Sequence, residues 1–256
     1  MKSYTKATNA VFIVFLSLGY LLADKNKPSS GNQQNQSFNK AKKKLKELYS
    51  DHKITFYCGC TYNDDKTINP DSCGYIPKKN SKRAKKIEWE HVVPAENFGR
   101  SFKEWREGDP ECVDRRGKSF KGRNCARKVN LKFRYMEADM YNLYPAIGEL
   151  NMRRSNYSYS MIGGEKREFG RCDFEVEDRK VEPRNEIFGD IARTYFYMNS
   201  SYPGHGIISG KNQKLFEAWD KMDPVDKWEC ERARRIKSIQ GNTNHIVEEA
   251  CKKAGL

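Results

Sequence analysis

Apolar residues recur at helical spacing near residue 40 and again through the C-terminal third of the chain. Ser37 precedes such a run, from Phe38 to Leu48, and predicts the start of a helix. Two similar stripes predict helices from Ile187 to Met198 and from Gln213 to Met222. Another helix is expected to start at Asp223-Pro224, as cap and first helical residue, and to end at Gly241. The C-terminal third is therefore expected to be mainly helical.

Shorter apolar runs in the first half of the chain predict strands. Ile54 to Tyr57 is one candidate, and Val92-Val93 is a second, which Pro94 ends or places at a sheet edge. Leu143 to Gly148 predicts a further short strand or extended turn, and the residues after it open a helix. Residues 99–130 show no clear period and predict a long irregular segment. The expected class is α+β, predominantly helical.

Residues 1–36 lie outside the pattern of predicted helices and strands, and the first 23 of them indicate export. Lys2 and Lys6 precede an apolar run of fourteen residues, 10–23. Because a membrane-spanning helix needs about 20 apolar residues, a cleaved signal peptide over 1–23 is favoured, with an uncleaved membrane anchor as the alternative. Residues 24–36 are polar, lack a hydrophobic period and predict a disordered linker.

Charge narrows the class of partner. The chain carries 48 Lys and Arg against 34 Asp and Glu, a formal charge of +14. Nucleic acid, anionic lipid and acidic polysaccharide are the polyanions that such an excess attracts. A basic protein without any polyanion ligand is the alternative. The lysines of residues 40–46 are interpreted as a solvated helix face, with phosphate binding as the lesser possibility.

Export changes the interpretation of the eight cysteines. An even number in an oxidising compartment predicts disulfides, whereas zinc is disfavoured because the chain has no Cys-x-x-Cys. Eight cysteines allow 105 pairings. Two pairs are predicted because each closes a short loop: Cys112 with Cys125, and Cys230 with Cys251.

Glu90 and His91 are the residues best suited to chemistry. Phosphodiester hydrolysis needs a base to activate water and a cation at the phosphate oxygens. A neutral imidazole suits the first task, and a carboxylate is the kind of ligand that Mg²⁺ prefers. In a regular strand these neighbours point to opposite faces, so they share a site only if the backbone is irregular there or if they flank the phosphate from two sides. The other three histidines, His52, His205 and His245, are interpreted as surface residues.

The sequence segments around Glu90 and His91, and others along the chain, resemble those of a known family. The pair lies in Glu88-Trp-Glu-His-Val-Val-Pro-Ala95, and further segments follow in a fixed order: Thr55-Phe-Tyr-Cys-Gly-Cys60, Ser72-Cys-Gly-Tyr75, Arg123-Asn-Cys125, Glu137-Ala-Asp-Met-Tyr-Asn-Leu143, Gly148-Glu-Leu-Asn151, Ile191-Ala-Arg-Thr-Tyr-Phe-Tyr-Met198 and Trp228-Glu-Cys-Glu-Arg232. In motif and order the chain resembles the bacterial endonuclease I family of periplasmic and secreted nonspecific nucleases. The resemblance covers residues 37–251, which are expected to form the nuclease domain, followed by a tail at 252–256.

The resemblance implies a site and a mechanism. It implies a ββα-metal (His-Me finger) motif inside a disulfide-stabilised, mostly helical fold, with His91 as the general base. Glu90 and Asn151 would hold a single Mg²⁺, for which Ca²⁺ or Mn²⁺ can substitute in binding. Arg123, from the segment Lys121-Gly-Arg-Asn-Cys125, would steady the product phosphate. The products would carry 5′-phosphates.

The resemblance also implies partners and a location. The expected substrates are double- and single-stranded DNA, with RNA as a further class, and the expected protein is a periplasmic or secreted monomer without stable membrane association. A catalytically impaired nucleic-acid-binding relative and a basic polyanion-binding envelope protein are the alternatives.

Three departures from the family are visible. The family commonly has His where this chain has Tyr141, and Gly-Asp-Arg where it has Met152-Arg153-Arg154. Both changes are expected near the metal site, where Arg153 in place of an acid would attract phosphate more strongly and weaken cation binding. The segment from Gly99 to Asn124 also diverges.

Overall fold

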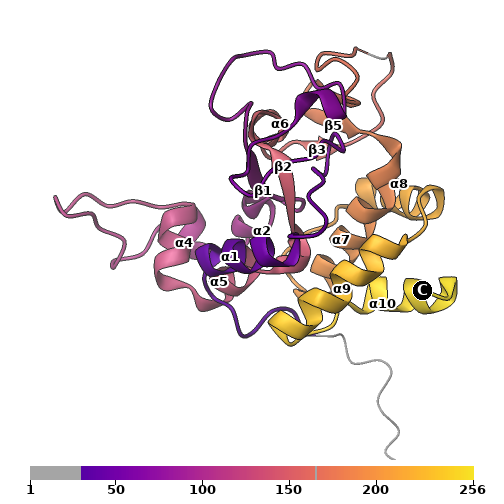
Figure 1. Cartoon of the computed structure of the whole chain (residues 1–256). Helices are drawn as coiled ribbons and strands as arrows, with labels where there is room; N and C mark the ends of the chain where they lie inside the picture. The colour runs from indigo at the N-terminus through magenta and orange to yellow at the C-terminus, as the bar shows by residue number, and fades with distance from the viewer. Residues whose placement is uncertain (1–29, 165) are drawn as a thin grey trace, which may run out of the picture.

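The computed structural model describes residues 30–164 and 166–256 (Figure 1). The predicted signal peptide lies outside the described residues. Two small sheets and a set of helices make up the described chain. The helices are α1 (Phe38–Leu48), α2 (Ala95–Gly99), α3 (Lys103–Arg106), α4 (Arg123–Val129), α5 (Leu131–Glu137), α6 (Gly148–Arg154), α7 (Phe188–Ser201), α8 (Gly210–Met222), α9 (Lys227–Gln240) and α10 (His245–Ala254). The mixed, helix-rich class agrees with the α+β prediction.

The first sheet consists of two antiparallel strands, β1 (Ile87–His91) and β2 (Leu143–Ile147). Their register places Glu90 opposite Tyr144 and His91 opposite Leu143. α6 begins at the residue after β2, so a strand pair and a helix meet at one place although β1 and β2 are far apart in sequence. Figure 1 shows β1, β2 and α6 together, with α4 and α5 to their left and the C-terminal helices to their right.

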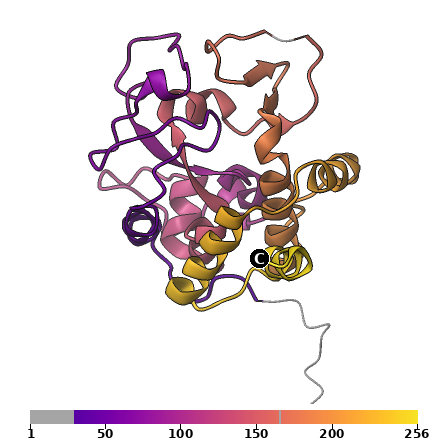
Figure 2. The same ribbon diagram turned by 45° about the vertical axis from the view of Figure 1, so that its right-hand side comes forward.

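The second sheet has three strands, β3 (Ser158–Tyr159), β4 (Phe174–Glu177) and β5 (Lys180–Pro183), in the order β3-β5-β4. β5 pairs in parallel with β3 and antiparallel with β4. In Figure 2 the orange and yellow helices of the C-terminal third lie together below this sheet. The sequence pattern had not predicted the sheet or helix α10.

The core is rich in aromatic side chains. One buried arginine, Arg232, links the C-terminal helices to the first sheet. The rings of Phe188 in α7 and Trp219 in α8 stack with centroids 4.0 Å apart. Arg232 of α9 is 3% exposed and donates hydrogen bonds to the hydroxyls of Tyr49 and Tyr144 and to carbonyls at the start of β2. Because a buried guanidinium left unpaired is costly, these bonds fix β2, and with it β1, against the C-terminal helices.

Local signals predicted the helix ends well in two cases. The side chain of Ser37 caps α1 by accepting a hydrogen bond from the backbone N–H of Lys40, as predicted. Gly241 ends α9 in the left-handed conformation, with φ of 80°, where a side chain would be strained. α9 begins differently from the prediction, because Asp226 caps it rather than Asp223.

Two predicted strands are absent. Val92 and Val93 are fully buried, but β1 ends at His91. The side chain of Asn142 accepts a hydrogen bond from the Val93 N–H at 2.7 Å and donates one to the Val93 carbonyl at 2.9 Å. A side-chain amide therefore satisfies the backbone that a neighbouring strand would have paired. The run from Ile54 to Tyr57 forms only an isolated bridge, between Ile54 and Thr61.

Four disulfides cross-link the described chain. Both predicted pairs, Cys112–Cys125 and Cys230–Cys251, are confirmed. The remaining cysteines form Cys60–Cys73 and Cys58–Cys172, and the latter closes a loop with a sequence separation of 114. No free cysteine occurs among the described residues.

The described part of the predicted linker packs against the helices. Asn32 is 1% exposed, and its backbone N–H donates to the Tyr202 hydroxyl at 2.7 Å. Its side-chain amide donates to the carbonyl of Tyr135 at 2.9 Å. Residues 30–36 therefore differ from the free polar segment expected from composition. Within residues 30–164 and 166–256, no helix has the length and hydropathy needed to cross a bilayer.

Candidate active site

A cleft of about 610 Å³ runs along β1. All five residues of β1 line it, whereas no residue of β2 does. Residues of α1, α2, α3, α4 and α6 and of the connecting loops complete its walls. All four predicted site residues lie in this lining: Glu90, His91, Arg123 and Asn151. The structure thus brings together side chains that are up to sixty-one positions apart in the sequence (151 − 90 = 61).

The cleft accounts for the two neighbours Glu90 and His91 sharing one site. The partners of Glu90 are Tyr57 and Arg154, whereas His91 contacts Phe38 and Glu137. Their side chains therefore leave β1 on different faces, as regular strand geometry requires. Among the described strands β1 pairs only with β2, and the Ile87 N–H at its start donates to the Lys66 carbonyl at 2.9 Å. Farther along β1, Glu90 and His91 both line the cleft. The regular strand geometry through Glu90 and His91 excludes an irregular backbone there and favours flanking from two sides.

His91 is held in a defined tautomer. Its Nε2 lies 2.8 Å from the carbonyl oxygen of Glu137. Because a carbonyl can only accept, Nε2 carries the hydrogen and Nδ1 keeps its lone pair. The ring packs on Phe38 of α1, with centroids 4.9 Å apart. Burial, together with the positive charge of Arg123, lowers the pKa of His91 to about 3, so the ring is neutral at physiological pH.

The carboxylate of Glu137 organises the cations beside that ring. It accepts hydrogen bonds from Nε of Arg123 and, at 2.7 Å, from Nε of Arg127. Burial alone would raise the pKa of Glu137, but the hydrogen bonds and charges of the two arginines outweigh it and lower the pKa. Arg123 keeps its buried Nη2 without a hydrogen-bond partner. A donor that is held in place and unpaired, inside a cleft, is suited to an anionic ligand.

Glu90 is 4% exposed and lies among polar groups. The hydroxyl of Tyr57 donates to its Oε1 at 2.8 Å, and Nε of Arg154 lies 3.4 Å from the same oxygen. Burial raises the pKa of Glu90 to about 7, although the charge of Arg154 and the hydrogen bond from Tyr57 oppose the rise. Both side-chain contacts are on Oε1, so they leave Oε2 for another ligand.

Asn151 belongs to the first turn of α6 and is oriented by a residue that sequence reasoning missed. Its Nδ2 donates to Oε2 of Glu88 at 3.0 Å, which leaves its Oδ1 as an acceptor. Glu88 is itself held by a bidentate pair with Arg83, at 2.7 and 2.6 Å. A Cβ on Gly148 would lie 2.8 Å from the Glu88 carboxylate, so glycine at the start of α6 gives that carboxylate its space.

The role of Glu88 has only a weak trace in the sequence. Glu88 and Glu90 occupy alternate positions of one strand and therefore share its face, which was the available signal. The salt bridge to Arg83 and the contact with Asn151 come from tertiary structure and leave no local pattern. Tyr57 and Arg154 were missed for the same reason.

Lysines border the mouth of the cleft. The lysines of α1 are mostly exposed, as expected for a solvated face, but Lys42 lines the cleft and its Nζ lies 4.7 Å from the Phe38 ring centroid. Burial, followed by the charges of Lys66, Arg127 and Arg123, lowers the pKa of Lys42. Lys66 also lines the cleft and has a left-handed φ of 72°, a strained conformation for a residue with a side chain. Lys42 and Lys66 repel each other and the nearby arginines, so an anion bound in the cleft would relieve that repulsion.

Neither Tyr141 nor Arg153, two of the residues that depart from the family, lines the cleft. Tyr141 does not line the cleft, and its hydroxyl donates to the carbonyls of Ala233 and Asn242 beside the C-terminal helices. Arg153 is turned to Glu168, at 3.4 Å, and is likewise absent from the lining. Both side chains thus have partners outside the cleft, and their expected effect on metal binding stays a prediction.

The remaining histidines also differ from the prediction. All three are partly buried rather than surface residues, and none lines the cleft. His52 stacks on Trp228 with ring centroids 3.7 Å apart, and His205 stacks on Phe102 at 4.8 Å. His91 is therefore the histidine that the fold places in the cleft. No group of three or more His, Cys, Asp or Glu side chains arranged to hold a metal ion occurs in the described part of the chain.

Comparison with known proteins places the chain among nucleases of one family. Residues 25–251 match the family model described as Endonuclease I. An extracellular deoxyribonuclease of Aeromonas hydrophila is 45% identical over 84% of this chain and 91% of its own length. A periplasmic deoxyribonuclease of the same organism is 43% identical, over 86% and 88%. An endonuclease-1 of Buchnera aphidicola is 42% identical, over 78% and 75%.

Proposed function

The chain belongs to the endonuclease I family, and on that premise we propose that it is a Mg²⁺-dependent, sequence-nonspecific endonuclease that hydrolyses the phosphodiester bonds of DNA. It is a periplasmic or secreted nuclease, as its relatives are. The observation that carries the finer proposal is the meeting of Glu90, His91, Arg123 and Asn151 in one cleft. The order β1, β2, α6 around them supports a ββα-metal, or His-Me finger, site.

The donor set fits a magnesium ion. Glu90 offers a carboxylate oxygen, and Asn151 offers Oδ1 because Glu88 occupies its Nδ2. Mg²⁺ prefers such hard oxygen ligands and is commonly held by only one or two side chains, with water and substrate phosphate completing its shell. Two protein ligands therefore agree with the lack of a larger metal-binding cluster among the described residues. When bound, the ion would polarise the scissile phosphate and stabilise the 3′ leaving oxygen.

His91 is proposed as the base. Its Nδ1 keeps a lone pair because Nε2–H donates to Glu137, so Nδ1 can take a proton from the attacking water. A pKa of about 3 makes the ring a weak base in the free protein. A phosphate bound beside it would bring negative charge, counter the effect of Arg123 and raise that pKa toward neutrality. Substrate binding would thus help to activate the base.

Arg123 is proposed as the phosphate ligand. Its Nε is occupied by Glu137, and its Nη2 has no hydrogen-bond partner. A guanidinium held on one side presents its remaining donors in a fixed direction, which suits a phosphate oxygen. Water attack at phosphorus with departure of the 3′ oxygen would leave a 5′-phosphate on the product, steadied by Arg123.

The charge of the protein explains the proposed lack of sequence preference. The formal charge of +14 and the cleft lysines Lys42 and Lys66 bind phosphates, which carry no base information. Double- and single-stranded DNA both present such phosphates, and so does RNA, which the proposal includes as a further substrate. We propose that the protein acts as a monomer.

Plasmid cleavage tests this function. Supercoiled plasmid should be nicked and then fragmented in Mg²⁺ at neutral pH, and EDTA should abolish cleavage because the ligands alone do not polarise the phosphate. Cleavage that persists in excess EDTA would contradict the metal-dependent mechanism. Retarded migration of plasmid without cleavage in Mg²⁺ would instead identify a catalytically impaired nucleic-acid-binding relative.

Replacing Glu88 with Gln should raise the Mg²⁺ concentration for half-maximal activity by roughly 10–100-fold, the usual effect of losing an outer partner of a metal ligand. The Asn151 amide would lose its charged acceptor and turn more freely. Titration calorimetry with Mn²⁺ would measure binding apart from turnover. Glu96→Gln is the matched control, because Glu96 also lines the cleft but pairs with Arg100. An unchanged metal affinity in Glu88→Gln would show that Asn151 needs no such support.

A further inference from the structure

A long arm leaves the body between α3 and α4. We call residues 107–122 the arm; Figure 1 shows it projecting at the left, beyond α4. It is ordered by an isolated bridge between Val113 and Ser119 and by a turn in which Asp114 Oδ1 accepts backbone N–H groups of Arg116 and Lys118, at 2.8 and 2.9 Å. The disulfide Cys112–Cys125 ties the arm to α4. Long segments that are tied down in this way are usually functional.

The tip of the arm is cationic. Residues 113–121 contain four basic side chains, all exposed: Arg115, Arg116, Lys118 and Lys121. The acid among them, Asp114, is engaged by backbone N–H groups. None of the four cations forms a salt bridge with another described residue, whereas the two arginines that line the cleft, Arg83 and Arg123, do. The other acids of the arm lie at its base, in residues 107–111. A distal cluster of unpaired cations is a surface for a polyanion.

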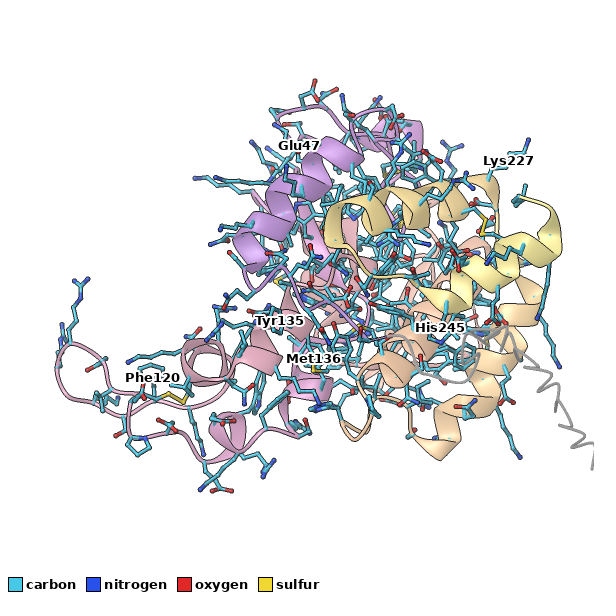
Figure 3. All side chains as sticks on the ribbon, turned by 90° about the horizontal axis from the view of Figure 1, so that it is seen from below. Glu47, Phe120, Tyr135, Met136, Lys227 and His245 are labelled. Carbon is cyan, nitrogen blue, oxygen red and sulfur yellow. A yellow bond between two sulfur atoms is a disulfide. The ribbon has the colours of Figure 1, made fainter. Side chains whose placement is uncertain are left out.

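The arm begins and ends beside the cleft. It returns to the body at Arg123, the first residue of α4 and part of the cleft lining. At the same point the Gly122 N–H donates to the carbonyl of Trp105, another lining residue, at 3.0 Å. Figure 3 shows the arm, marked by Phe120, projecting at the left, and α1, marked by Glu47, at the top of the body. α1 carries Lys42 into the cleft, so positive charge lies both in the cleft and on the arm that joins it at Arg123.

We propose that the tip of the arm is a second phosphate-binding surface, which contacts duplex DNA away from the scissile phosphate. This inference rests on the proposed function. Arg116 lies seven residues from Arg123 (123 − 116 = 7), so an extended chain sets its reach at about 23 Å at most. With a rise of about 3.4 Å per base pair, the tip reaches phosphates up to about seven base pairs from the cut. Short substrates cannot extend to the tip, whereas long duplexes can.

A triple variant tests the arm: Arg115→Gln, Arg116→Gln and Lys118→Gln. Loss of three phosphate contacts should raise KM for a 30-base-pair duplex roughly tenfold and make the salt dependence of log KM shallower by about 2.7. kcat should stay unchanged because the cleft is untouched, and cleavage of a hexanucleotide should also be unchanged. Neutralising exposed residues should spare the fold, and an unaltered melting temperature would verify this.

The matched control removes the same charge from exposed lysines of α8, as Lys211→Gln, Lys214→Gln and Lys221→Gln. Figure 1 places α8 on the opposite side from the arm. An equal rise in KM for this control, or for the hexanucleotide, would overturn the proposal in favour of general charge. So would an unchanged KM for the duplex, or an arm variant whose only loss is binding to anionic lipid vesicles.

Failure of the proposed function would be recognisable separately. If the wild-type protein does not cleave DNA at all, fluorescence anisotropy in EDTA with the same duplex still measures how much the arm contributes to DNA affinity. The arm variant should then bind the duplex roughly tenfold more weakly than the α8 control. Equal affinities of the two variants would refute the arm independently of catalysis.

Discussion

Replacing His91 with Ala should lower the rate of plasmid cleavage by roughly 10²–10⁴-fold, the usual contribution of a positioned general base. The substitution removes the only cleft imidazole among the described residues and leaves Arg123, Glu90 and Asn151 in place. Phosphate binding should therefore persist, so the loss should appear in kcat rather than in KM. A nicking assay at saturating Mg²⁺, run with varied plasmid concentration, separates the two constants.

His205→Ala is the matched control, because His205 is also partly buried and stacked on an aromatic ring but lies outside the cleft. It should cleave within about twofold of wild type, because its ring does not line the cleft. Both variants should keep the circular dichroism spectrum of the wild type. A His91→Ala protein that is folded and fully active would exclude this ring as the base.

Full reduction of the four disulfides should abolish nuclease activity by unfolding the protein. In the chain-entropy account, closing a loop of about 15 residues contributes about 3 kcal/mol and one of about 100 residues about 4.7 kcal/mol. The separations here are 13, 13, 21 and 114 residues. Together such contributions are comparable to the whole stability of a domain, about 5–15 kcal/mol. Activity and near-ultraviolet circular dichroism after incubation with a strong reductant would measure the effect.

Reoxidised protein is the control, and it should recover activity if reduction acted only through the disulfides. The expected consequence in a cell is that the nuclease stays inactive in a reducing cytosol and becomes active after export, which spares the genome of the host. A reduced protein that retains full activity would refute this account.

The fold was predictable where a local signal decides the structure. The hydroxyl of Ser37 could be assigned as a cap because capping involves only the next three residues. Asp223 and Asp226 are alike by that criterion, and tertiary contact separates them. Asp223 instead accepts a hydrogen bond from the N–H of Gly189 at 2.8 Å, which leaves Asp226 to cap α9. Local sequence carries no trace of that choice.

The candidate site shows the same division. His91 could be singled out from its chemistry, and Arg123 and Asn151 from the resemblance, because motif order preserves their identity. The residues that orient these side chains and shift their pKa values could not be predicted from the sequence. Glu137 contacts His91 through its backbone carbonyl, and any residue has a carbonyl, so no residue type marks that role. Glu88 and Tyr57 act through contacts across the fold, between residues whose separation in sequence hides their proximity.

Glu137 also limits how the energetics of this site can be divided. Its carbonyl fixes the proton on His91, and its carboxylate fixes Arg123, whose charge in turn lowers the pKa of the same ring. A substitution at Arg123 therefore changes the base, and one that frees Glu137 changes both partners. Single-variant losses at these positions will not add. His91 and Arg123 are best treated as one thermodynamic unit, measurable by a double-mutant cycle rather than residue by residue.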